Sequence, residues 1–362
     1  SVQRGGLEEI KLHGAADTGE AFISVSGALH CWTKGVETYN AGAGAKDGHL
    51  MTSFSHGNEY RDGFHHLGRS SASDRNYGAY FFFWNSDHKI ENNILRQHRH
   101  SIVLEGGGSG FAILYNYIDD NYTDDLSYLG SARTNHGPHP MFNLWEGNHI
   151  SHLEADSVFG GSSHIVYYRN WLRGGQSGIE VPGMPSGGFA GLDIRGGNWY
   201  HAAVGNVLGE PEWTSGLVLV SSPGCASSIY GRTPFAYHIG CRPTDSKAYD
   251  TTIKHGNYDH ISQGVEFWDG GSDHELRDSL YYASAPSWWG CQRWPAFGPD
   301  LDPVAQSIPA KDRFEGVTDA CPEETCSQLG GECCSDGQLC ADGSFATSAD
   351  CGARCCRGGS CQ

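Results

Sequence analysis

The sequence predicts an all-β protein: a right-handed parallel β-helix followed by a small disulfide-rich domain. Three observations predict it: a short repeat, a composition without helix-forming stretches, and a C-terminal cluster of cysteines. The repeat is an apolar stretch, then Asn or Asp, then another apolar residue. It occurs at Asn93, Asn116, Asn148, Asn170, Asn206, Asn257 and Asp278, in steps of 23, 32, 22, 36, 51 and 21 residues. Self-similarity with such a period is typical of solenoid proteins.

Each copy of the repeat predicts strands, because β-branched and aromatic residues dominate it and no helical period is present. We expect the Asn at the bend between two strands of one coil. Asn tolerates a left-handed backbone, and its amide can bond to the equivalent amide one coil away. Glycine makes up 51 of the 362 residues, which suits a chain with many turns.

The charge of the chain excludes some partners. The net charge is −18, with only 24 Lys and Arg residues, which argues against a nucleic-acid partner because affinity for phosphates comes from basic side chains. The same charge disfavours a polyanionic glycan unless a cation bridges the two. No apolar run approaches the roughly 20 residues that would span a membrane.

The cysteines divide the chain into three parts. We expect a parallel β-helix over residues 1–292, a Pro-rich linker packed on the solenoid over 293–320, and a disulfide-rich module over 321–362. The tryptophans just before and within the linker are expected to cap an open end of the solenoid: Trp288, Trp289 and Trp294. Because residue 1 is not Met, we expect that earlier coils or a signal peptide were removed from a precursor.

The disulfide-rich module is too short and too poor in aliphatic residues to fold around a core, so it must be stapled by disulfides. Spacing alone leaves the pairing open among Cys326, Cys333, Cys334, Cys340, Cys351, Cys355, Cys356 and Cys361. Elsewhere we expect Cys225 to pair with Cys241 and Cys291 with Cys321, which leaves Cys31 as a buried free thiol. Disulfides predict an oxidising compartment, hence a secreted, extracellular protein.

Several segments together carry a resemblance to a known group. They include FISVSGALHCWTKGVETYNAG, YGAYFFFWNSDHKIENNIL, HGPHPMFNLWEGNHI, AAVGNVLG, IKHGNYD and SLYYASAPSWWGCQRWPAFGPD. Over residues 20–315 the chain resembles secreted bacterial right-handed β-helix repeat proteins of the pectate-lyase-like superfamily. The resemblance implies the fold but no single activity, because that superfamily contains lyases, hydrolases, phage tailspikes and adhesins. The tandem-Asp signature of the hydrolases and the Arg-centred motif of pectate lyases are missing from the sequence.

Chemistry is expected around the insertion at residues 119–140, because insertions in a solenoid project from one face. Coils stack about 4.8 Å apart, so side chains at equivalent positions converge to catalytic distances. The candidate catalytic residues are Arg133, His136, His139 and Glu146. The candidate substrate-binding residues are Arg99, Tyr122, Tyr128 and Trp145, and a Ca²⁺ site is expected at Asp119, Asp120, Asp124 and Asp125.

Two functions remain open from the sequence. The first is a secreted protein that binds polysaccharide or a cell-surface glycan and cleaves it as a lyase or glycoside hydrolase. The second is a structural extracellular protein without activity, which self-associates end to end as a filament or belongs to an envelope or adhesion structure.

Overall fold

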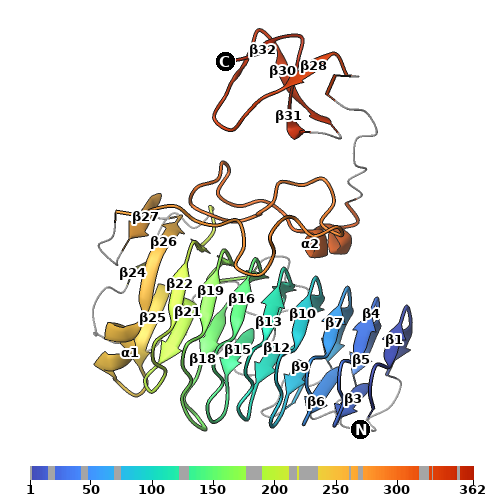
Figure 1. Ribbon diagram of the computed structural model, residues 1–362. Coiled ribbons are helices and arrows are strands. Elements are labelled where there is room, and N and C mark those ends of the chain that lie inside the picture. Colours follow the sequence, from blue (N-terminus) through green and yellow to red (C-terminus); the bar gives the residue numbers. More distant parts are fainter. Residues whose placement is uncertain are drawn as a thin grey trace.

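The computed structural model describes residues 2–14, 21–41, 48–68, 75–121, 130–176, 190–211, 218–219, 235–260, 262–267, 272–317, 326–327, 329–348 and 351–362. Up to β26, the described strands form three faces of parallel β-sheet, stacked coil upon coil (Figure 1). Each complete coil gives one strand to each face. The expected all-β parallel solenoid is therefore confirmed.

Two of these faces, called here the first and second sheets, are joined at β26 (Ile253–Asp259). The first sheet runs in order from β1 (Gly6–Glu8) through β4 (Trp32–Lys34), β7 (Glu59–Arg61), β10 (Lys89–Glu91), β13 (Ala112–Leu114), β16 (Leu144–Glu146), β19 (Val166–Tyr168) and β22 (Ala202–Val204) to β26. The second sheet contains β2 (Lys11–His13), β5 (Glu37–Ala41), β8 (Phe64–Gly68), β11 (Ile94–Arg96), β14 (Tyr117–Asp119), β17 (His149–Ile150), β20 (Trp171–Leu172) and β23 (Val207–Leu208).

The third sheet is separate and parallel throughout. It contains β3 (Ile23–Ser26), β6 (Leu50–Ser53), β9 (Tyr77–Phe81), β12 (His100–Leu104), β15 (Ala132–Asn135), β18 (Leu153–Ala155), β21 (Ala190–Arg195), β24 (Val218–Leu219) and β25 (Phe235–Cys241). After β25, helix α1 (Ser246–Thr251) leads into β26, and β27 (Gly264–Phe267) pairs with β26 in antiparallel fashion. No helix among the described residues is long and apolar enough to cross a membrane.

The repeated asparagines form a ladder at the bend between the first and second sheets. The Asn116 backbone N–H and side-chain amide both donate to Oδ1 of Asn148, at 2.9 and 3.0 Å. Asn148 donates in turn to Oδ1 of Asn170, at 2.9 Å, and to the Ile113 carbonyl, at 2.8 Å. The same contacts continue through the buried side chains of Asn93, Asn206 and Asn257.

Two details of the sequence interpretation were wrong. The residue in the left-handed conformation is the one before each ladder Asn, for example Tyr115 (φ 54°), Gly147 (φ 68°) and Arg169 (φ 47°). Asp278 is not a further copy of the repeat, because it lies outside any strand in the segment after β27.

Residues 272–317, called here the covering segment, lie over the outer side of the first and second sheets and contain helix α2 (Pro309–Glu315) (Figure 1). Trp289 is buried against Tyr115, with ring centroids 4.9 Å apart. The Arg169 guanidinium pairs with Asp300 at 2.7 Å. The expected tryptophan cap is therefore corrected: these rings seal the flank of the solenoid at the fifth coil rather than its end.

The C-terminal module forms two small antiparallel sheets from β28 (Gly331–Cys333), β29 (Cys340–Ala341), β30 (Ser344–Ser348), β31 (Gly352–Arg357) and β32 (Ser360–Cys361). Four disulfides staple it: Cys326–Cys355, Cys333–Cys351, Cys334–Cys361 and Cys340–Cys356. Cys241 and Cys291 are also disulfide-bonded, while their expected partners Cys225 and Cys321 lie outside the described residues. Among the described cysteines, Cys31 is a free thiol and is half-buried.

Histidines are buried inside the solenoid as neutral rings. The Thr38 hydroxyl bridges Nδ1 of His49 and Nδ1 of His65, at 2.6 and 2.7 Å. Burial lowers the pKa of His65 to about 4 and that of His98 to about 3. Burial also lowers the pKa of His88 and of His201 to about 3.

The asparagine ladder predicts a graded loss of stability. Asn148→Ala removes four hydrogen bonds of the buried amide and should lower the free energy of unfolding by about 2–4 kcal/mol. The control is Asn143→Ala, whose amide bonds the Phe111 N–H and the Gly108 carbonyl and should cost about half as much. Urea unfolding measures both variants, and equal losses would contradict the role of the ladder.

The buried histidines predict destabilisation by mild acid. In the unfolded chain these rings protonate near pH 6.5, whereas in the folded protein they stay neutral to about pH 3–4. Stability is therefore full above pH 6.5 and falls as the pH decreases, by about 1.4 kcal/mol per histidine between pH 7.5 and about 5.5. Glu91 and Glu146, whose pKa burial raises, offset part of this loss. Urea unfolding at pH 7.5 and about 5.5 should show this loss of stability as a lower midpoint urea concentration at the lower pH. An unchanged midpoint would refute the prediction.

Candidate active site on the third sheet

A row of charged and polar side chains crosses the outer face of the third sheet. Arg133, Glu154, Asp193 and His238 occupy equivalent positions of β15, β18, β21 and β25. Each is flanked along its strand by residues that face the core, as in Leu153-Glu154-Ala155, so strand alternation points all four side chains outward. In earlier coils the same position holds Met51, Tyr80 and Val103, so the polar row begins at β15.

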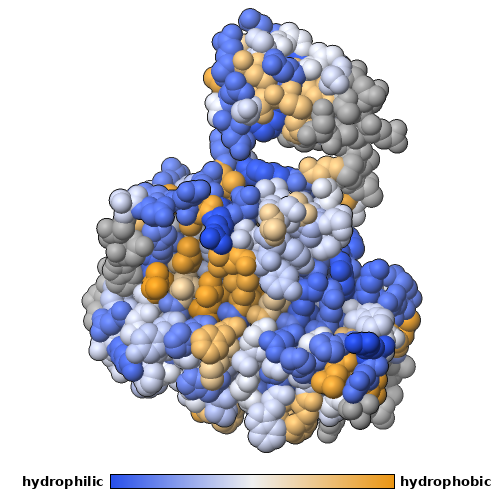
Figure 2. Space-filling view, in the orientation of Figure 1, coloured by the Kyte–Doolittle hydropathy of each residue, from blue (hydrophilic) through white to orange (hydrophobic). Residues whose placement is uncertain are grey.

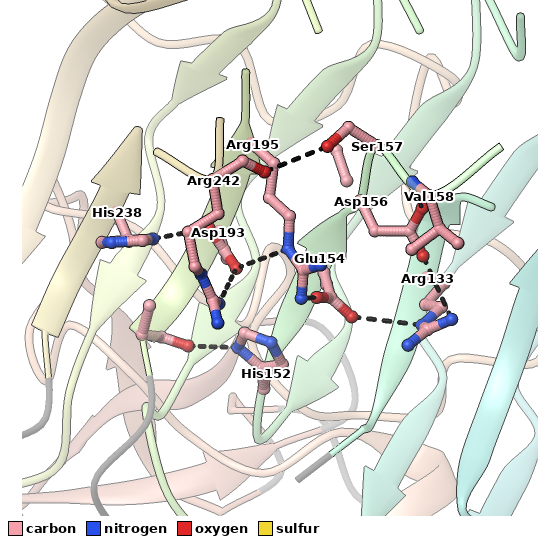
Figure 3. Close-up of polar contacts among 12 residues, drawn as sticks. Arg133, His152, Glu154, Asp156, Ser157, Val158, Asp193, Arg195, His238 and Arg242 are labelled. Carbon is pink, nitrogen blue, oxygen red and sulfur yellow. Dashed lines mark hydrogen bonds and ion pairs between the residues drawn. The ribbon is translucent and has the colours of Figure 1, made fainter. Parts of the chain in front are cut away.

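Ion pairs connect the row from coil to coil (Figure 3). The Arg133 Nε donates to Glu154 at 3.1 Å, and Arg195 pairs with the other oxygen of Glu154. Arg195 also lies 3.4 Å from Asp193, which accepts from Nδ1 of His238 at 2.8 Å. The Arg242 guanidinium approaches Asp193 at 3.7 Å, so Asp193 has both an imidazole and guanidinium partners.

A second carboxylate–imidazole pair lies at the end of β15 and β18. The Asp156 Oδ2 lies 2.5 Å from Nδ1 of His136 and 3.0 Å from the Arg133 guanidinium. Its Oδ1 accepts the Val158 N–H at 3.0 Å, which fixes the carboxylate. Two imidazoles of the cluster, His136 and His238, are therefore each oriented by an aspartate.

Two carboxylates of the cluster, Glu154 and Asp156, are held ionised. Burial alone would raise the pKa of Glu154, but the charges of Arg133 and Arg195 outweigh it and leave this pKa below its usual value. Burial opposes ionisation of Asp156 as well, and its bond to His136 together with Arg133 lowers that pKa. Neither carboxyl is therefore a proton donor near neutral pH.

Three side chains of the cluster could hold a metal ion. One ligand atom from each of His152, Glu154 and Asp193 lies within 4.8 Å of the others. His152 bonds the Ala190 carbonyl through Nδ1, and within the described part of the chain its buried Nε2 has no hydrogen-bond partner. However, guanidinium groups already pair with both carboxylates, so a divalent cation would have to displace positive charge.

The cluster is reached from the carboxyl ends of the strands. Glu154, Asp193 and His238 have fully buried side chains. The side chains of Arg195 and Arg242, which end or follow their strands, are 13% and 35% exposed. A ligand that approaches the carboxylates therefore meets arginines first.

The structure brings together only some of the residues that the sequence suggested. Arg133 and His136 belong to the cluster. Arg99 is half-buried in the turn before β12. Burial lowers the pKa of His100, and the charges of Arg133 and then Arg99 lower it further.

Three other candidates lie away from the cluster. His139 is exposed and bonds Ser163. Glu146 lies on the first sheet beneath the covering segment, where it accepts from Tyr115 and from the Leu280 N–H. Trp145 is fully buried in the core and cannot stack on a sugar.

The expected Ca²⁺ ligands do not converge among the described residues. Asp119 is buried and pairs with Arg173 at 3.0 Å. Asp120 is buried and pairs with Arg96 at 3.2 Å. The other expected residues of that loop lie outside the described residues: Tyr122, Asp124, Asp125 and Tyr128.

The residues that the sequence interpretation missed are Asp193, Arg195, His238 and Arg242, and it gave no role to Glu154 and Asp156. One signal was available: β15, β18, β21 and β25 each carry a charged or polar residue between two core residues, in A-R-T, L-E-A, L-D-I and Y-H-I. Aligning the coils on that triplet, rather than on the asparagines, places the four side chains in one row.

No family model, no curated protein and no solved structure matches this chain. The chemistry of the cluster therefore has to be argued from its own geometry.

The ion-pair network predicts a large cost for removing its central carboxylate. Glu154→Ala leaves Arg133 and Arg195 without their shared buried partner and should lower the free energy of unfolding by about 3 kcal/mol. The control is Asp87→Ala, whose 59% exposed side chain should cost about 0.5 kcal/mol or less. Urea unfolding tests both variants, and similar losses would show that the buried network does not stabilise the fold.

Proposed function

We propose that the protein is a secreted enzyme that binds polysaccharide and cleaves it by β-elimination at the third-sheet cluster. The observation that carries the proposal is the register-matched row of Arg133, Glu154, Asp193 and His238. Burying charges on an outer face costs free energy that apolar residues would not cost. Clusters of buried ionisable groups with shifted pKa values are typical of functional sites.

The two imidazoles are the proposed proton-transfer groups. Asp156 orients His136, and Asp193 orients His238. A carboxylate at one ring nitrogen fixes the tautomer and stabilises the protonated imidazole. An imidazole can accept or donate a proton near neutral pH, so one ring can serve as base and the other as acid.

The arginines favour a substrate that carries a carboxylate, such as a uronate. A guanidinium that pairs with this carboxylate makes the neighbouring C5 proton more acidic. The base then removes the C5 proton, and the electron pair forms a double bond between C4 and C5. The bond from C4 to the glycosidic oxygen breaks, and the acid protonates that oxygen.

Hydrolysis fits the cluster less well. Glycoside hydrolases use a protonated carboxylic acid next to an ionised one. Here the pKa values of Glu154 and Asp156 are both lowered, so neither carboxyl keeps a proton for the leaving group.

Although the whole chain is acidic, an anionic substrate can approach this site because the cluster has as many guanidinium groups as carboxylates. The whole chain has a net charge of −18. Within the cluster, three guanidinium groups balance the carboxylates of Glu154, Asp156 and Asp193. Secretion is supported by the four disulfides of the C-terminal module. The alternative function, a filament without enzymatic activity, does not explain the row of charged side chains on the third sheet.

The test is cleavage of a panel of uronate-containing and neutral polysaccharides. The parent should release products whose unsaturated uronate ends absorb ultraviolet light. Asp193→Asn and His238→Gln should each lower kcat by roughly 100-fold or more. The control is His13→Gln, an exposed imidazole on β2 of the second sheet that bonds Asn40, which should keep parental activity.

Two outcomes would contradict the proposal. New reducing ends without ultraviolet absorbance would indicate hydrolysis instead of elimination. No cleavage of any polysaccharide by the parent would reject the catalytic role.

A further inference from the structure

Exposed aromatic rings gather on one edge of the solenoid. Eight aromatic side chains stand among the exposed large hydrophobic residues of the described chain, and six of them lie on this edge. All six lie in connections that run from a third-sheet strand to the next first-sheet strand. We call this set the aromatic edge; its members are Phe54, Phe83, Trp84, Phe142, Phe159 and Tyr200.

Most of the rings form two groups along the axis of the solenoid, one near the ends of third-sheet strands and one just before first-sheet strands. Phe54 and Trp84, from neighbouring coils, have centroids 5.3 Å apart. Phe142 and Tyr200 flank His164, with centroid distances of 5.1 and 5.3 Å. The coil between these two groups places Gly106 beside Trp84, where the Trp84 N–H bonds the Gly106 carbonyl at 3.0 Å. The edge therefore presents rings on both sides of a stretch without side chains.

The aromatic edge is continuous with the candidate active site. His136 and Asp156 are the first residues after β15 and β18, so they begin the same connections. The His136 ring lies 5.1 Å from the ring of Phe159. The more exposed arginines of the cluster, Arg195 and Arg242, also lie at this end of the strands.

The adjoining part of the first sheet is apolar as well. Leu144, Val166 and Ala202 occupy equivalent outward positions of β16, β19 and β22. Figure 2 shows hydrophobic residues gathered over these strands. The edge thus borders the charged cluster on one side and an aliphatic surface on the other.

We propose that the aromatic edge binds a polysaccharide chain along the solenoid axis and delivers it to the cluster. This inference rests on the proposed function and identifies the surface that holds the substrate. The C–H faces of sugar rings stack on aromatic faces, and this contact needs no basic side chains, which suits a chain with a net charge of −18.

A repeating ligand fits this surface better than a folded protein does. The rings occur in two offset groups, one on the second and third coils and one on the fifth to seventh coils, which together extend over about 24 Å at roughly 4.8 Å per coil. Protein partners concentrate their binding energy in a compact, fully covered centre instead.

The experiment is affinity electrophoresis of the full chain in gels that contain one polysaccharide each, from the same panel of uronate-containing and neutral polymers. The parent should be retarded by at least one polymer. Trp84→Ala, which removes a ring that is 71% exposed, should weaken that retardation by roughly tenfold. Tyr200→Ala should weaken it in the same direction, and Trp84→Phe should restore most of it.

The matched control is Tyr281→Ala. Tyr281 and Tyr200 are 46% and 48% exposed, but Tyr281 lies on the covering segment, away from the edge. Its replacement should leave retardation unchanged. The inference is overturned if no polymer retards the parent, if the Trp84 and Tyr200 variants behave like the parent, or if the control loses retardation equally. It is also overturned if the parent is a dimer that Trp84→Ala dissociates, since the edge would then bind a second copy.

Cleavage and binding separate the two proposals. An Asp193→Asn variant that is retarded like the parent but does not cleave supports both. If the parent is retarded through Trp84 and cleaves nothing, the aromatic edge stands and the catalytic proposal falls. If the parent cleaves and the edge variants bind normally, the catalytic proposal stands and the aromatic edge is rejected.

Discussion

The stack of coils depends on one interaction, the hydrogen bonding of each coil to the next by backbone and buried amides. Strands of three or four residues are too short to be stable alone, and each gains its partners only from the coils above and below. The asparagine ladder continues this pairing through the bend, where strand pairing stops. Because the Asn148 amide bonds both neighbouring coils, it also fixes their register. That register places Arg133, Glu154 and Asp193 side by side.

The parts of the fold with a local cause could be predicted from the sequence. Asn93, Asn116, Asn148, Asn170, Asn206 and Asn257 all take their expected places, because an amide buried at a bend needs an equivalent amide one coil away. Asp278 matched the same pattern, but the predicted repeat there was wrong, because a short motif does not indicate whether another coil follows. The tryptophans were expected to cap an open end of the solenoid, but the surface that they cover is the flank formed by Tyr115 and its neighbours, far away in the sequence.

The site was harder to predict, for a physical reason. The cluster combines residues from β15, β18, β21 and β25, which insertions of different lengths separate in the sequence. Composition pointed to the acidic stretch around Asp119 and Asp120, where charges are dense. In the structure these two carboxylates neutralise Arg173 and Arg96. Glu146 likewise looked reactive by type, yet it holds the covering segment through the Leu280 N–H. Residue type alone does not distinguish a tether from a reactive group.

The covering segment also bears on the order in which the molecule is assembled. Arg313 bonds the Asn92 carbonyl across 221 residues, and Asp300 meets Arg169 across 131. During synthesis the strands of the solenoid emerge long before residues 272–317, so the flank around Tyr115 is uncovered at first. A nascent chain at that stage exposes hydrophobic surface. Partly folded chains of this kind are bound by chaperones and tend to aggregate. Residues 272–317 thus complete the flank that the earlier coils leave uncovered.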